Sequence, residues 1–154
     1  MRKALFVAFA LLLLGQTCPA ETYETPKETL DAYLNACQAG DLEAAELCYT
    51  SSSREVAKQD AEQGAAPPPD ALKSAYERLK DVDFKLEEVN AKRAIFWPAD
   101  ESIPPMFMRI QQEEEGWRLD YHFMSRYIRV GEDGWSWRDP RVFQIWKKSL
   151  LLIV

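Results

Sequence analysis

Asp120 and His122 are the side chains of this sequence that most resemble a general base with an orienting carboxylate. His122 is the single histidine, and Asp120 lies two residues before it, which puts both on one face of a β-strand. The segment WRLDYHF (117–123) alternates, however, with Trp117, Leu119 and Tyr121 on its apolar face. We therefore expect Asp120 and His122 to face solvent or a partner chain, and we predict no catalytic residue.

Cys37 and Cys48 form the second pair of reactive side chains, on either side of a Gly-Asp break in NACQAGDLEAAELC. Two thiols without a nearby histidine or third thiol make a poor zinc site, and their spacing is not the Cys-x-x-Cys of a redox motif. Two structural interpretations stay open: an internal disulfide, or two separate buried thiols. In either case the pair is structural.

Other sequence signals for cofactor chemistry are missing. The sequence has no serine in a nucleophile elbow, no glycine-rich loop before a helix and no cluster of histidines and cysteines. We therefore predict no cofactor and no metal. The chain has 19 basic and 25 acidic residues and a net charge of −6, and an acidic balance disfavours nucleic acids and anionic membranes as partners.

Residues 1–20 have the three-part pattern of a secretory signal peptide. A positive start, Met1-Arg2-Lys3, precedes an uncharged apolar run from Ala4 to Leu14, and Cys18-Pro19-Ala20 ends in small residues. The apolar run is shorter than the ~20 residues of a membrane-spanning helix. We expect cleavage after Ala20 and an exported, periplasmic or secreted, mature chain. Acylation of Cys18, which would give a lipid anchor, is the alternative.

The hydrophobic period changes from that of helices to that of strands along the chain. Helices are predicted over residues 26–39, 42–48, 52–63 and 71–79, with caps at Thr25, Asp41, Ser52 and Asp70. Strands are predicted over residues 82–89, 94–97, 106–112 and 117–123, followed by a hairpin of YIRV and WSW and a last helix after Asp139. Helices followed by antiparallel strands indicate an α+β fold.

Three segments carry a family resemblance: TPKETLDAYLNACQAGDLEAAELCY, the strand Val82–Val89 and EEEGWRLDY. In these segments the chain resembles the nuclear-transport-factor-2-like superfamily, which includes ketosteroid-isomerase-like and SnoaL-like proteins. The resemblance implies a curved antiparallel sheet that wraps on helices into a cone with a pocket at its open end. It does not imply a function, because that fold hosts enzymes, binders and assembly domains.

The resemblance divides the chain into three parts. After the signal peptide (1–20), residues 21–124 form the superfamily domain, and residues 125–154 form an extra hairpin and helix that pack on the same domain. Five side chains are expected to line the pocket: Tyr33, Phe84, Met108, Trp117 and Tyr121.

The C-terminal part is rich in tryptophan. Trp135, Trp137 and Trp146 are interpreted as packing onto the domain, with a protein interface or glycan binding as alternatives. The final SLLLIV is too short to cross a bilayer by itself, and we expect it to dock on the core.

The main hypothesis is an exported, non-catalytic domain that binds a partner protein or a small apolar ligand, with a homodimer also open. One alternative is a small isomerase- or hydratase-like enzyme that uses the same pocket. The other is the extracytoplasmic domain of a truncated membrane protein.

Overall fold

The computed structural model describes residues 22–65, 67–68, 70–111, 116–131 and 134–148. The expected signal peptide, its cleavage after Ala20, the acylation of Cys18 and the final SLLLIV all lie outside these residues.

The first helical hairpin forms as its capping residues predict. Helix α1 spans Pro26–Ala39, and a complete capping box joins Thr25 and Glu28 at its start. Gly40 ends α1 at a φ of 72°, a left-handed conformation that suits glycine. Helix α2 spans Leu42–Leu47, and the Asp41 carboxylate accepts a 3.0 Å hydrogen bond from the Ala44 amide.

The next two helices differ from expectation in their capping. Helix α3 spans Ser51–Glu62, and Thr50 caps it by accepting a hydrogen bond from the Ser53 amide. The predicted cap Ser52 is therefore already helical, because Thr50, two residues earlier, provides the capping hydroxyl. Helix α4 spans Ala71–Leu79; Asp70 occupies its cap position but makes no side-chain capping bond.

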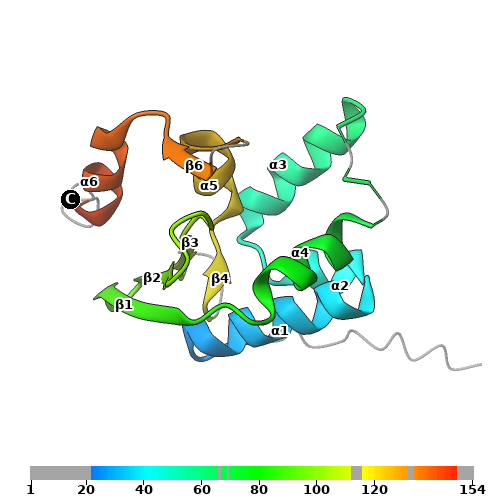
Figure 1. Cartoon of the computed structure of the whole chain (residues 1–154), viewed down its shortest axis with the longest axis horizontal. Coiled ribbons are helices and arrows are strands. Elements are labelled where there is room, and N and C mark those ends of the chain that lie inside the picture. Colours follow the sequence, from blue (N-terminus) through cyan, green and yellow to red (C-terminus); the bar gives the residue numbers. More distant parts are fainter. Residues whose placement is uncertain (1–21, 66, 69, 112–115, 132–133, 149–154) are drawn as a thin grey trace, which may run out of the picture.

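Four antiparallel strands follow in the order β1-β2-β3-β4. They are β1 (Phe84–Asn90), β2 (Arg93–Pro98), β3 (Met106–Arg109) and the short β4 (Arg118–Leu119). The backbone at residues 48–50 runs along the outer side of β4: the Leu119 amide donates to the Cys48 carbonyl, and the Thr50 amide donates to the Leu119 carbonyl. Together with the helices, this sheet confirms the α+β class (Figure 1).

The predicted fourth strand, residues 117–123, is wrong in its second half. The strand ends at Leu119, and residues Tyr121–Tyr127 form helix α5. Asp120 is the reason, because its carboxylate accepts a hydrogen bond from the Phe123 amide and so caps a helix. Alternation over residues 117–121 fits a strand, but Phe123 and Tyr127 also lie one helical turn apart on a common face.

The C-terminal part contains the predicted hairpin and helix. Strands β5 (Ile128–Gly131) and β6 (Gly134–Trp137) pair in a separate two-stranded sheet, and helix α6 spans Pro140–Lys148. The amphipathic face of α6 is turned toward the four-stranded sheet through Trp146, which is 5% exposed.

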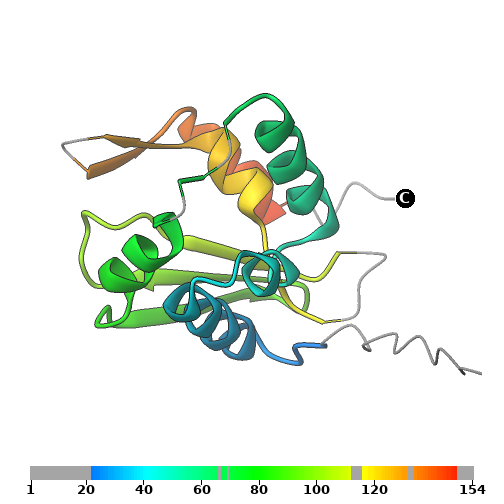
Figure 2. The same cartoon turned by 90° about the vertical axis from the view of Figure 1, so that its right-hand side faces the viewer.

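Helices cover both faces of the four-stranded sheet, so the fold has three layers (Figure 2). On one face, α1 and α4 pack over a first core, which contains Leu30, Phe96, Met106, Met108 and Leu119. On the other face, α5, α6 and β5 pack over a second core, which contains Ile95, Phe107, Phe123, Ile128 and Trp146. The cone shape of the resembled superfamily stays a prediction.

Candidate functional site

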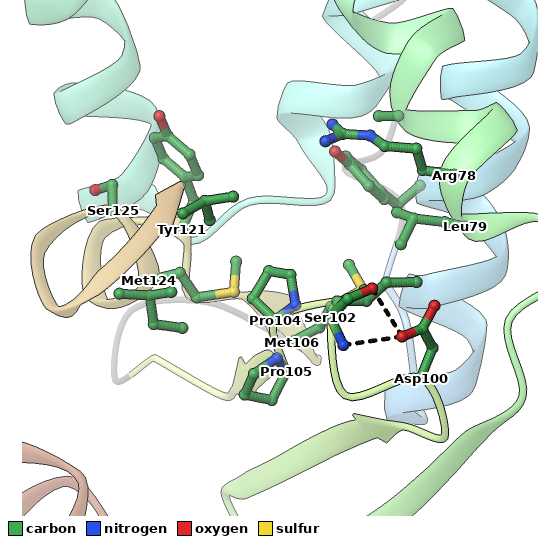
Figure 3. Close-up of a pocket in the computed structure, with 15 residues that line it drawn as sticks. Arg78, Leu79, Asp100, Ser102, Pro104, Pro105, Met106, Tyr121, Met124 and Ser125 are labelled. Atoms are coloured by element: carbon green, nitrogen blue, oxygen red, sulfur yellow. Dashed lines mark hydrogen bonds between the residues drawn. The ribbon is translucent and has the colours of Figure 1, made fainter. Parts of the chain in front are cut away.

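A pocket of about 610 Å³ lies at the end of the sheet where β2 connects to β3. Helix α4 and the side of α1 form one wall, and α5 and strand β5 form the opposite wall (Figure 3). The connecting segment of residues 100–106 forms the floor between them. A cavity of this size is typical of small-molecule sites.

The floor is shaped by a tight turn and two prolines. The Asp100 carboxylate accepts hydrogen bonds from the Ser102 amide (2.8 Å) and the Ser102 hydroxyl (2.7 Å). Pro104 and Pro105 follow, and their rings restrict the backbone so that the segment presents an apolar surface upward. Figure 3 shows these prolines beside Met106, below the side chains of the two walls.

The walls combine an apolar surface with a few polar groups. Leu79, Met124 and Ile128 supply apolar area, and Val130 extends it along β5. The polar residues of the walls are Tyr33, Arg78, Tyr121 and Ser125, and the floor adds Asp100 and Ser102. Mostly apolar walls with a few polar groups are the usual composition of a ligand site.

The structure brings two of the five predicted pocket residues to the cavity. Tyr33 and Tyr121 line it. Met108 and Trp117 belong instead to the first core, where Met108 is fully buried, and Phe84 packs edge-on against Phe96 at the margin of that core. They are displaced because the inner face of the sheet is closed by α1 and α4, and the hollow lies beyond the strand ends.

Sequence reasoning missed most of the actual pocket wall. Arg78 lies on a helix face, and residues 102–105 form a connecting loop. Met124 belongs to α5, a helix that was not predicted and whose first three residues were predicted as strand. The one sequence signal for this wall is the pair Pro104-Pro105, which predicts a stiff connection. The pair does not indicate which part of the molecule that connection faces.

A row of phenols runs from the pocket into the first core. The Tyr33 and Tyr49 ring centroids are 5.9 Å apart, and Tyr49 stacks on Tyr121 at 5.4 Å. The Tyr33 hydroxyl hydrogen-bonds to the side chains of Tyr49 and Cys37. Burial raises the pKa of Tyr33 well above its ordinary value and that of Tyr49 to about 12, and it also raises the pKa of Tyr121. These phenols are therefore neutral hydrogen-bonding groups at ordinary pH.

Cys37 and Cys48 are both buried and are not joined by a disulfide, so the structure corrects that candidate pairing. Each sulfur faces a different tyrosine: Cys37 lies against Tyr33, whereas Cys48 Sγ is 3.7 Å from the Tyr23 hydroxyl. Burial raises the pKa of the Cys37 thiol, and a protonated thiol is a poor nucleophile.

Asp120 is not solvent-exposed as expected, which is a second correction. It is 3% exposed, and its carboxylate lies 3.4 Å from Arg109 Nε and 3.4 Å from Trp146 Nε1. The cause is the capping position, which turns the carboxylate inward at the start of α5. The Asp120 carboxylate thus contacts residues of three elements, β3, α5 and α6.

His122 does not pair with Asp120. It lies half-buried in the first turn of α5, and its backbone amide donates a 3.0 Å hydrogen bond to the Ser53 hydroxyl. Neither residue lines the pocket. The structure therefore does not assemble the acid–base pair that the spacing suggested.

The three C-terminal tryptophans pack onto the domain. Trp146 is buried against Phe107 with ring centroids 4.8 Å apart, and Trp137 packs on the same phenylalanine at 5.8 Å. Trp135 is half-buried and lies edge-on to Trp137. The interface interpretation of these residues stays a prediction for the parts of Trp135 and Trp137 that reach the surface.

Metal and membrane signals can be judged for the described residues alone. In that part of the chain no group of three or more histidine, cysteine, aspartate and glutamate side chains could hold a metal ion. None of the helices described there has the length and apolar composition to cross a bilayer.

Comparisons with protein-family models, with curated proteins and with solved structures gave no match for this chain. The resemblance to the nuclear-transport-factor-2-like superfamily therefore stays a prediction from the three quoted segments.

Proposed function

We propose that this chain is an exported, non-catalytic binding domain that takes a small, largely apolar ligand into the pocket between α4, α5 and β5. The observation that carries the proposal is the cavity of about 610 Å³ with a mainly apolar lining. Removing apolar surface from water contributes roughly 25 cal/mol per Å², so such a cavity supplies the main driving force for an apolar ligand. The few polar groups would set the ligand's orientation.

The polar groups of the pocket favour binding over proton transfer. A general base works best when its pKa lies near the working pH. Here the hydrogen bonds from Ser102 lower the pKa of Asp100, and burial raises the pKa values of Tyr33 and Tyr121. These shifts favour the ionised form of Asp100 and the neutral forms of Tyr33 and Tyr121. Groups held in one form support a binding site more than an isomerase- or hydratase-like enzyme.

Binding of a neutral dye tests this function. N-phenyl-1-naphthylamine fluoresces strongly in apolar surroundings, and we expect saturable binding to the purified mature chain. Ala75 is half-buried on α4 and lines the cavity, so Ala75→Phe should fill the site and weaken dye binding by roughly tenfold or more, a loss of about 1.4 kcal/mol.

Ser74→Phe is the matched control, because Ser74 is exposed on the same helix and does not line the cavity. It adds the same ring and should leave dye binding unchanged. Equal binding to wild type and Ala75→Phe would contradict the proposed site.

A further inference from the structure

Arg78 is a cation at the pocket without an anionic partner in the described part of the chain. It lies near the end of α4, is exposed, and lines the cavity. No ion pair or hydrogen bond joins its guanidinium to another described side chain. Nearby Lys80, in contrast, is paired with Glu77 at 2.7 Å. The five N–H donors of Arg78 are therefore available to a ligand.

The acid of the pocket is already engaged. One carboxylate oxygen of Asp100 accepts two hydrogen bonds from Ser102, which shape the floor. The other oxygen of Asp100 stays open to a cationic ligand, so the acid offers one free oxygen, whereas Arg78 offers an anionic ligand all five of its N–H donors. Charge complementarity thus favours a negative head group, and guanidinium binds carboxylate in a two-point geometry.

Polar and apolar groups occupy different levels of the cavity. Figure 3 shows the Arg78 guanidinium and the Tyr121 hydroxyl on opposite walls, above a floor of Pro104, Pro105 and Met106. Met124 reaches down the same wall as Tyr121. A ligand with one charged end and an apolar body fits this separation, since its head can stay near the opening while its body covers the floor.

We infer that the ligand class of this pocket is an anionic amphiphile, with a carboxylate head on Arg78 and an apolar body over Pro104, Met106 and Met124. The inference rests on the proposed function and adds to it the sign of the head group and the residue that binds it.

Three ligands of equal chain length test the inference by displacement of bound N-phenyl-1-naphthylamine: decanoate, decanol and decyltrimethylammonium. On the wild-type chain, decanoate should bind roughly tenfold more tightly than decanol, the size expected of one charged hydrogen-bonded contact at an accessible site. Raising the salt concentration should reduce this preference, because the contact is electrostatic.

Arg78→Gln should remove the preference for decanoate and leave the affinity for decanol unchanged. Arg78→Lys keeps the charge but not the two-point geometry, so it should retain part of the preference. Arg129→Gln is the matched control, because Arg129 is exposed on β5 and does not line the cavity. It removes the same charge and should leave the preference for decanoate intact.

The possible failures are distinguishable. If the dye binds and is displaced equally by decanoate and decanol, or best by decyltrimethylammonium, the anionic head group is overturned while the pocket's function stands. The same conclusion follows if Arg129→Gln acts like Arg78→Gln, since the effect is then one of net charge. If the dye itself does not bind, the proposed function fails and the inference fails with it.

Discussion

The two faces of the four-stranded sheet bury polar groups in different ways. The face under α1 and α4 packs neutral phenols beside its core, with the Tyr33 hydroxyl hydrogen-bonded to the side chains of Tyr49 and Cys37. The face under α5 and α6 buries the carboxylate of Asp120 beside the guanidinium of Arg109. Neutral groups need only a hydrogen-bond partner in a core, whereas a buried charge needs an opposite charge as well.

The second face depends on contacts from the C-terminal helix α6. Trp146 of α6 donates to the Asp120 carboxylate, its ring packs on Phe107, and the Arg93 guanidinium lies 5.1 Å from the centre of that ring. Without α6 the second face of the sheet would expose an aromatic core and a charged pair. Strand β5 and helix α6 thus form, together with α5, one of the three layers.

The strongest test compares neighbours on β3 that point to opposite faces. Phe107→Ala should lower the free energy of unfolding by about 4 kcal/mol and Met108→Ala by about 3 kcal/mol, since both side chains are fully buried. Urea unfolding gives the values. Near-ultraviolet circular dichroism should change more for Phe107→Ala, which loses its contact with Trp146. Two separate transitions in Phe107→Ala would show that the faces fold independently and would contradict a single unit.

Asp120 tests the charged face by itself. Asp120→Ala removes the cap of α5 and leaves Arg109 without its carboxylate, so it should cost about 3 kcal/mol in urea unfolding. Asp120→Asn keeps a capping oxygen and should cost less. Asp139→Asn, at an exposed pair with Arg141, is the control and should change stability little. Equal effects for the two aspartates would mean that the buried charge has no special part in stability.

Alkaline pH tests the neutral face and should give the smallest effect. Burial raises the folded-state pKa of Tyr49 from 10.0 to about 12. The stabilisation from the neutral phenol is therefore complete below pH 10 and is lost as the pH rises toward 12. Tyr49→Phe should cost about 1 kcal/mol at neutral pH and should lose less stability than the wild type above pH 10. Parallel losses in the two chains would show that Tyr49 does not contribute to alkaline unfolding.

Local signals in the sequence predicted local structure well. The Thr25–Glu28 capping box, Gly40 and Asp41 each appear in the structure where their side-chain chemistry indicates. They succeed because a cap is formed between residues a few positions apart. Apart from α5, the order of helices, strands and final hairpin follows from such signals together with hydrophobic periodicity.

The error at residues 120–123 has a definite cause. Asp120 in an alternating segment indicates a solvent-facing strand position, and the same residue before Tyr121 is also a helix cap. The choice between strand and helix depends on Arg109 and Trp146. Both contact the Asp120 carboxylate in the fold although they are distant from it in the sequence. The pocket was missed for a related reason, because its walls meet only after the two faces of the sheet have been covered.

The backbone of residues 48–50 beside β4 has a consequence for association between molecules. An unpaired edge strand can recruit a strand from another molecule. Here one border of the sheet is occupied by the hydrogen bonds of Leu119 to Cys48 and Thr50, and the opposite border is β1, whose Lys85 and Glu88 place charges along it. Both borders of the four-stranded sheet thus disfavour edge-to-edge pairing with a second molecule.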